Sequence, residues 1–308
     1  MSRTAELERG LVVGSHGRHV VVETPEGRQL ICHPRGKNNQ AVVGDRVLWL
    51  PSGDEGSVEQ IEPRRNLFYR QDEVRTKSFA ANVDQVLILI AAEPEFSESQ
   101  LARALVAAEA EQILPVIVLN KSDLAEAHAR AWARLAPYQR MGYTVLPLNL
   151  KAPGLAPELT ALQAQLRGRA TLVLGPSGAG KSTLINRVVP GAQAQTGEIS
   201  TALNSGKHTT TSTRWYWIDS TRQTALIDSP GFQEFGLRHI AAAQLATLMP
   251  DLRAQAGSCR FYNCSHLHEP DCGVIAAVDT ADEGDGISPS RYRIYSELHA
   301  ELSQAPRY

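Results

Sequence analysis

The chain has 308 residues, which allows two or three domains, and its hydrophobic content of 43% is enough for sizeable cores. The formal net charge is −2, so the overall composition lacks the basic excess that nucleic-acid binding often leaves. The longest apolar run, residues 86–92, has the length of a strand rather than a membrane span, and residues 1–6 open no signal-peptide pattern. We therefore expect a cytoplasmic protein that does not enter the membrane.

The N-terminal part consists of short β-rich runs separated by glycine and proline turns. These runs are residues 11–13, 19–23, 29–31, 46–50 and 57–61. About five strands in this length predict a small β-barrel at residues 1–75, with the OB-fold as the leading candidate. Its exposed basic residues are candidate RNA contacts, although a solvated surface explains them equally well. They are Arg35, Lys37, Arg64 and Arg65.

From about residue 80 the chain alternates between strands and helices, which predicts a parallel α/β domain at residues 76–238. The expected strands are residues 83–91, 116–119, 143–148, 170–174, 215–218 and 224–227. The expected helices are residues 99–112, 124–140, 157–167 and 182–189. A helical and cysteine-rich part follows at residues 239–308, with a last helix over 289–302. The chain as a whole is predicted to be a multidomain α/β protein.

The tetrapeptide N-K-x-D follows the expected strand 116–119, and it predicts a guanine-binding loop. It is formed by Asn120, Lys121, Ser122 and Asp123. The Asp123 carboxylate can accept hydrogen bonds from the N1–H and the exocyclic amine of guanine, a donor pair that adenine lacks. Asn120 would contact the purine and brace the loop, and the stem of Lys121 would pack along the ring. The alternative is a helix N-cap made by Ser122 or Asp123.

A complete phosphate-binding loop, G-x-x-x-x-G-K-[ST], follows the expected strand 170–174 and opens a helix. It is formed by Gly175, Pro176, Ser177, Gly178, Ala179, Gly180, Lys181, Ser182 and Thr183. Lys181 would hold the β- and γ-phosphates, and Ser182 would bind Mg²⁺. A glycine-rich turn with a chance lysine is the alternative, but the strand–loop–helix context favours phosphate binding.

The D-x-x-G motif beginning at Asp228 completes the set, and its place in the chain reveals an unusual order. The guanine motif precedes the phosphate loop, whereas an ordinary GTPase has it last. We interpret this inversion as a circular permutation of an intact nucleotide-binding fold. Asp228 would reach Mg²⁺ through a water molecule, and the Gly231 amide would meet the γ-phosphate.

Residues 207–211 lie between the phosphate loop and Asp228, where a switch threonine that senses Mg²⁺ is expected, with Thr210 as the candidate. Phe232 occupies the position at which many GTPases carry a glutamine that orients the attacking water. Phenylalanine cannot do this, so we expect slow hydrolysis by the isolated protein. His208 is the candidate group for orienting the water, although a partner-contacting or structural role would also suit a histidine. A local polar turn is the alternative for the whole segment.

Three of the four cysteines lie close together in the C-terminal part, in the pattern C-x4-C-x-H-x5-C. Cys259, Cys264, His266 and Cys272 would supply three thiolates and one imidazole, which suits a closed tetrahedral Zn²⁺ site. His268 is an alternative ligand. Such clustering in a cytosolic chain favours a metal over a disulfide, and reduced buried cysteines are the remaining alternative.

These motifs together resemble the ribosome small-subunit-dependent GTPase A (RsgA) family of circularly permuted bacterial GTPases, over nearly the whole chain. The nucleotide motifs at residues 120–123, 175–183, 206–211 and 228–232 look like those of the family. The cysteine cluster matches the family's zinc ligands in type and spacing. Arg291, Tyr292 and Tyr295 also resemble its C-terminal part. One departure is Asn149-Leu150-Lys151, where the family has a Ser-Ala-Lys-like motif whose backbone amide contacts the guanine O6; the Leu150 amide could still do so.

The resemblance implies an OB-like barrel, a permuted GTPase domain and a C-terminal zinc domain. It also implies a GTP-hydrolysing factor for late maturation of the small ribosomal subunit, stimulated by that subunit and in contact with its rRNA. The implied cofactors are one structural Zn²⁺ and Mg²⁺ with GTP, and we expect a monomer. The main alternative is a GTP-regulated protein-docking switch unrelated to ribosomes. An ATP-dependent enzyme and a zinc redox protein are more distant alternatives, and the N-K-x-D motif argues against the former.

Overall fold

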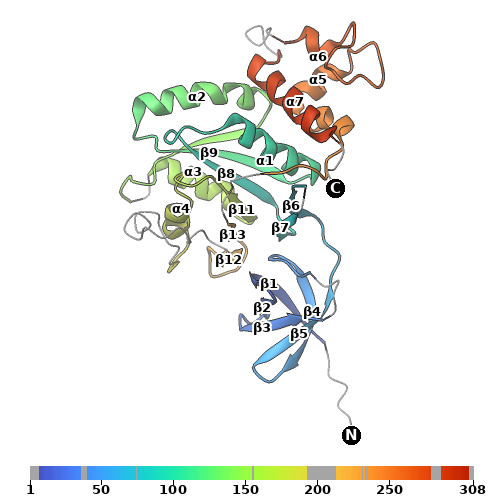
Figure 1. Ribbon diagram of the computed structural model, residues 1–308. Helices are drawn as coiled ribbons and strands as arrows, with labels where there is room; N and C mark the ends of the chain where they lie inside the picture. Colours follow the sequence, from blue (N-terminus) through green and yellow to red (C-terminus); the bar gives the residue numbers. More distant parts are fainter. Residues whose placement is uncertain are drawn as a thin grey trace, which may run out of the picture.

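The computed structural model describes residues 7–35, 40–73, 75–154, 156–192, 213–230, 232, 235–278 and 286–304. Figure 1 shows a small barrel at one end of the molecule, an α/β layer structure in the centre and a group of short helices at the other end. This arrangement confirms the predicted fold class. No helix within these described ranges is long and apolar enough to cross a membrane.

The N-terminal strands close into a five-stranded barrel. Its strands are β1 (Glu8–His16), β2 (His19–Glu23), β3 (Gln29–Pro34), β4 (Arg46–Ser52) and β5 (Glu55–Ile61). The order is β1-β2-β3-β5-β4, and β4 pairs back onto β1, which is the closure expected of an OB-like barrel. Burial alternates along β3 and β4, so one face of each strand fills the interior, where Trp49 is fully buried.

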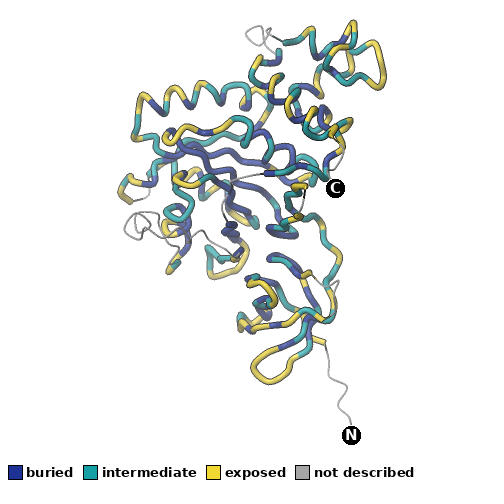
Figure 2. Tube along the Cα trace, viewed as in Figure 1, coloured by how far each residue is buried: buried dark blue, intermediate teal, exposed yellow. Residues whose placement is uncertain are grey.

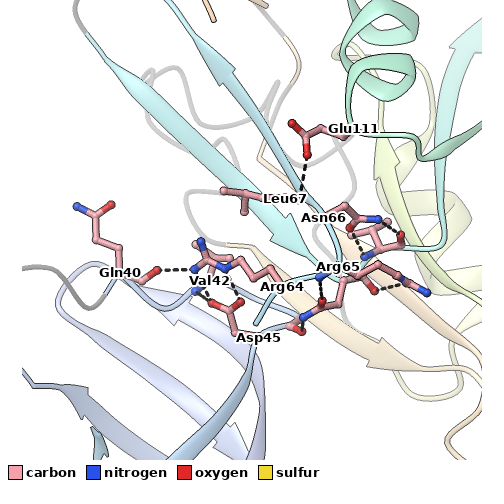
Figure 3. Close-up of polar contacts among 11 residues, drawn as sticks. Gln40, Val42, Asp45, Arg64, Arg65, Asn66, Leu67 and Glu111 are labelled. Carbon is pink, nitrogen blue, oxygen red and sulfur yellow. Dashed lines mark hydrogen bonds and ion pairs between the residues drawn. The ribbon is translucent and has the colours of Figure 1, made fainter. Parts of the chain in front are cut away.

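Residues 64 and 65, which follow the barrel, form side-chain hydrogen bonds with the barrel on one side and with the start of the central sheet on the other (Figure 3). Arg64 donates from Nε and Nη2 to the carboxylate of Asp45 at 2.7 and 2.8 Å, and Asp45 is completely buried. Arg65 donates to Asp84 at 2.7 Å, at the start of the central sheet. Both arginines therefore make contacts within the chain, and their role as RNA contacts stays a prediction.

A two-stranded ribbon, β6 (Leu67–Gln71) and β7 (Thr76–Ala81), follows this segment and packs against the barrel. The Ala81 amide donates to the Val43 carbonyl at 2.8 Å, and Asn82 Nδ2 donates to the Gly44 carbonyl at 2.9 Å. Gly44 has φ +91°, and a Cβ there would lie 2.1 Å from the Ala81 carbonyl oxygen. Only glycine allows this close approach between barrel and ribbon.

The central sheet is parallel in the order β10-β9-β8-β11-β13, with the antiparallel strand β12 added at its edge. Its strands are β8 (Gln85–Ala91), β9 (Leu114–Asn120), β10 (Thr144–Leu148), β11 (Ala170–Leu174), β12 (Arg214–Trp217) and β13 (Ala225–Asp228). Every residue of β8 is buried because helices cover both faces of the sheet, as Figure 2 shows.

The helices of the central part divide between the two faces. The first face packs against α1 (Glu98–Ala110) and α2 (Ala125–Arg140), and the second against α3 (Pro157–Leu166) and α4 (Lys181–Val188). Ile88 and Ile90 belong to the first core, whereas Leu87 and Leu89 belong to the second. This alternation along one strand produces a sheet with two apolar cores.

The C-terminal part contains short helices that dock on α1 and α2. They are η2 (Ala242–Leu248), α5 (Pro250–Ala256), α6 (Gly273–Ala276) and α7 (Pro289–Leu302). Arg291 on α7 forms a buried ion pair with Asp251 on α5 at 2.8 Å, and its guanidinium lies 5.2 Å from the ring of Tyr138 on α2. A second ion pair joins Arg103 on α1 to Glu301 on α7. These contacts fix the C-terminal part against the nucleotide-binding core.

Candidate nucleotide site and metal centre

The phosphate loop connects the buried strand β11 to α4 at the carboxyl edge of the parallel sheet, the edge at which such folds bind ligands. Gly178 and Gly180 have φ of +82° and +102°, which side chains rarely adopt. A Cβ on Gly175 would lie 2.7 Å from the Leu89 carbonyl oxygen. The glycines therefore allow the sharp turn and the close packing that bring the first amides of α4 to the mouth of the loop.

Lys181, the first residue of α4, brings the phosphate loop and the D-x-x-G motif together. Its ammonium forms an ion pair with Asp228 at the end of β13 and donates to the Ser229 carbonyl at 2.7 Å. Both side chains are nearly buried, with 10% of Lys181 and 6% of Asp228 exposed. The cation expected to hold phosphates and the carboxylate expected to approach Mg²⁺ thus lie side by side, with the half-buried Ser182 next in the chain.

Asn120 links the guanine loop to the phosphate loop. Its Nδ2 donates to the Ala179 carbonyl at 2.8 Å, and its Oδ1 accepts from the Leu150 amide at 3.3 Å. A Cβ on Gly180 would lie only 2.5 Å from Asn120 Nδ2. The bracing expected of Asn120 is therefore visible as two hydrogen bonds, while its contact with the purine stays a prediction.

The other residues of the guanine loop are arranged around a left-handed turn at Lys121, whose φ is +68°. Lys121 Nζ donates to the Glu93 carbonyl, and the Ser122 amide donates to the Leu148 carbonyl at 3.1 Å. Leu124 is the N-cap residue of α2, which has no side-chain cap. Ser122 and Asp123 therefore do not cap this helix, and that alternative reading of the tetrapeptide fails.

Sequence reasoning missed one neighbour of Asp123. Lys151 Nζ lies 3.8 Å from Asp123 Oδ2, although the two residues belong to different loops. The Asn149 carboxamide oxygen accepts from the amides of Lys151 and Ala152 at 2.9 and 3.1 Å and closes the turn. The Leu150 amide already donates to Asn120, so its contact with the guanine O6 also stays a prediction.

Several predicted catalytic groups fall outside the described residues. His208, Thr210 and Gly231 belong to this set, and Lys37, a predicted RNA contact, also lies outside the described residues. Phe232 is described, and its side chain is 5% exposed, with its ring centroid 5.4 Å from that of Phe235. This side chain belongs to the apolar core, which agrees with the expectation that it does not orient water.

The four predicted metal ligands come together in the C-terminal part. One ligand atom from each of Cys259, Cys264, His266 and Cys272 can be chosen so that all lie within 4.8 Å of one another. His266 Nδ1 lies 3.4 Å from Cys259 Sγ and 3.5 Å from Cys272 Sγ. The cysteines are not disulfide-bonded. This donor set, which includes His266 and not His268, can hold a metal ion.

The chain around the metal ligands is held by hydrogen bonds to its backbone. Tyr292 and Tyr295 on α7 donate their hydroxyls to the carbonyls of His266 and Ser265, at 2.9 and 2.6 Å. The Glu269 carboxylate accepts from the Ser265 amide at 2.7 Å. Burial lowers the pKa of His266, which favours the neutral imidazole that binds metals. The ligands are thus positioned by the fold itself.

Comparisons with known proteins show the family to which the chain belongs. The family model described as RsgA GTPase matches residues 61–238. The small ribosomal subunit biogenesis GTPase RsgA of Variovorax paradoxus (strain S110) is 70% identical over 299 residues, covering 97% of this chain and 94% of that protein. The protein of the same name from Paraburkholderia phymatum is 49% identical over 308 residues, covering 99% and 95%.

Two solved structures share the fold over the full length. The crystal structure of YjeQ from Thermotoga maritima has a TM-score of 0.74 and 27% identity, covering 97% of this chain and 100% of that one. The structure of YloQ, described as a circularly permuted GTPase, has a TM-score of 0.70 and 26% identity, with 100% of both chains covered. The permuted order of motifs read from the sequence is therefore confirmed, and the chain belongs to the RsgA GTPase family.

Proposed function

We propose that this chain is a GTP-hydrolysing assembly factor that acts in late maturation of the small ribosomal subunit and is stimulated by that subunit. The observation that carries the proposal is 70% identity over 97% of the chain to a protein named as a small ribosomal subunit biogenesis GTPase. Identity at this level extends beyond the GTPase part to the barrel and the C-terminal helices. The parts that would dock on a partner are therefore shared along with the nucleotide site.

In the proposed reaction, Lys181 and the amides at the start of α4 hold the phosphates of GTP, and Asp123 selects the guanine base. Ser182 and Asp228 would hold Mg²⁺, directly and through water respectively, and the ion would neutralise the charge that develops on the phosphates. Thr210 is the proposed switch residue that senses this ion. Gly231 would contact the γ-phosphate through its amide.

The nucleotide site as described lacks a side chain that orients water at position 232, because Phe232 is buried. We propose that His208 supplies this function when the protein is docked on the small subunit. An incomplete site in the free protein gives a physical reason for stimulation, since the partner supplies or orders the missing group.

We further propose that the C-terminal metal is Zn²⁺, in one structural site per chain. Three thiolates and an imidazole match the preferred ligands of zinc, and four protein ligands leave no position for a substrate. Metal analysis of the purified protein tests this assignment. About one zinc per chain is expected; iron or no metal in protein purified without chelators would contradict it.

Contact with rRNA, a monomeric state and the division at residues 1–75, 76–238 and 239–308 also belong to the proposal. Among the basic barrel residues, Arg35 fits an RNA contact best, because its side chain is 70% exposed although it pairs with Glu59 at 2.9 Å. Arg64 and Arg65 are engaged within the chain.

The docking part of the proposal is tested by sedimentation with purified small subunits. With a non-hydrolysable GTP analogue the protein should sediment with the small subunit, and with GDP it should largely remain in the supernatant. Large subunits serve as the control. Equal binding to both subunits, or no binding in either nucleotide state, would favour a protein-docking switch that acts elsewhere.

A further inference from the structure

Strand β12 joins the barrel directly to β13, the strand that carries Asp228. Arg214 on β12 pairs with Asp228 on β13, and on its other side Arg214 pairs with Gly14 on β1. The Ser15 amide also donates to the Thr213 carbonyl at 3.3 Å. A continuous row of paired backbone therefore runs from the barrel to the aspartate that contacts the phosphate-loop lysine.

A buried carboxylate of the barrel holds the far end of β12. Glu23, the last residue of β2, is 6% exposed and accepts a hydrogen bond from Trp217 Nε1 at 2.7 Å. Its other oxygen, Oε2, accepts from Gln29 Nε2 at 2.8 Å, and Arg222 Nη1 lies 3.8 Å from Oε1, the oxygen that accepts from Trp217. Because a buried carboxylate is stable only with such partners, Glu23 and Trp217 keep each other in place.

The turn between β12 and β13 is held as well. Arg222 donates to the Pro25 carbonyl at 3.1 Å, and its guanidinium lies over Gly27, where a Cβ would come within 1.7 Å of Nη2. The barrel thus contacts β12 at its start, at its end and at the following turn. Through the pairing of Arg214 with Asp228, these contacts connect the barrel to the phosphate-loop side of the sheet.

We propose that Glu23 is a positioning residue for the stimulation of GTP hydrolysis by the small subunit, and not for the basal reaction. By holding Trp217, it keeps β12 in register between β1 and β13, so that docking of the barrel on the small subunit alters the position of Asp228. This inference rests on the proposed function. It adds the contacts through which docking of the barrel would affect the nucleotide site. It requires no contact between Glu23 and GTP.

Trp217→Phe and Glu23→Ala test the proposed coupling, because each removes the hydrogen bond between the Trp217 indole on β12 and Glu23 in the barrel. Turnover stimulated by saturating small subunits should fall about fivefold through kcat, while turnover without subunits stays within about twofold of the parent. The double variant should be no worse than Glu23→Ala alone. Glu23→Gln should keep most of the stimulation, because its carbonyl can still accept from the indole.

Glu55→Ala is the matched control, since it removes a barrel carboxylate whose ion-pair partner among the described residues is His33 on β3 rather than a residue of β12. Stimulated turnover equal to that of the parent in both Trp217→Phe and Glu23→Ala would overturn the inference. An equal loss with and without subunits would also overturn it, because that pattern indicates general damage. If the parent itself is not stimulated, the proposed function fails, and the coupling to docking fails with it.

A second measurement needs no ribosomes. Hydrogen exchange of peptides covering β1 is compared between GDP and a non-hydrolysable GTP analogue, with β3 as the internal control because it does not pair with β12. Exchange in β1, including the Ser15 amide, should depend on the nucleotide in the parent and depend less on it in Trp217→Phe. Identical exchange of the β1 amides in both nucleotides would show that the bound nucleotide does not affect the barrel through the pairing of β1, β12 and β13.

Discussion

At the scale of single residues, the nucleotide site depends on a few side chains that hold loops together as well as on those expected to touch GTP. Lys181 contacts Asp228 and the Ser229 carbonyl, and Asn120 joins the guanine loop to the phosphate loop. These contacts connect three separate loops at one edge of the sheet. A single substitution should therefore affect GTP binding or hydrolysis according to which of these loops it disconnects.

Lys181→Ala should reduce GTP turnover at least about a hundredfold, because it removes the cation that stabilises charge on the transferred phosphoryl group. Phosphate release with and without small subunits measures this effect. Arg130→Ala, which removes an exposed cation from α2, is the control and should behave like the parent. Parent-level turnover in Lys181→Ala would mean that the assigned phosphate site is wrong.

Asp123→Asn should change the base that is preferred. An amide cannot accept from both guanine donors, but it can donate to a carbonyl oxygen at the same place on xanthine. We expect GTP affinity to fall by about a hundredfold or more and xanthosine triphosphate to compete better than GTP. Competition against a fluorescent guanine nucleotide measures both values. Unchanged preference for GTP would remove Asp123 from base recognition.

At the scale of elements, buried polar pairs fix how helices meet. Arg291 and Asp251 are 3% and 8% exposed, and they join α7 to α5 beneath Tyr138. Asp251→Ala should destabilise the C-terminal part by about 3–5 kcal/mol, because it leaves a buried guanidinium unpaired. Adding Arg291→Met should recover part of this loss. Urea unfolding with a zinc-sensitive dye measures the stability of the C-terminal part in the parent, the single variant and the double variant. A double variant less stable than Asp251→Ala alone would contradict this expectation.

Metal removal should loosen the C-terminal helices without abolishing nucleotide binding. The ligands Cys259, Cys264 and Cys272 lie in irregular chain that packs against α7. With a chelator, limited proteolysis should begin near residues 257–273 while GDP affinity changes little, since closed metal sites contribute folding energy locally. An unchanged cleavage pattern in metal-free protein would show that the fold of this part does not depend on the ion.

Much of the fold could be predicted because it follows from regular patterns. The apolar run of β8, the motif-bearing ends of β9 and β11, and the helix α7 lie within a few residues of their expected positions. The ribbon of β6 and β7 was missed, because its residues are mostly half-buried and lack a clear alternation. The pairing of Glu23 with Trp217 was missed too, since contacts between distant segments leave no periodic signal.

At the scale of the whole molecule, the barrel, the GTPase core and the C-terminal helices are joined by specific contacts rather than by free linkers. Arg64 and Arg65 fix the barrel exit, and β12 extends the nucleotide-binding sheet into the barrel. A permuted order of motifs makes this possible, because both ends of the GTPase core are free to carry a further part. These connections are what the proposed coupling between docking of the barrel and GTP hydrolysis requires.

The most direct test of this account is GTP turnover by the purified protein with and without isolated small ribosomal subunits, with large subunits and ATP as controls. We predict slow turnover alone, strong stimulation by small subunits only, and no turnover of ATP. Tight GTP binding with no stimulation by small subunits would contradict the proposed function and leave only a GTPase whose partner lies elsewhere.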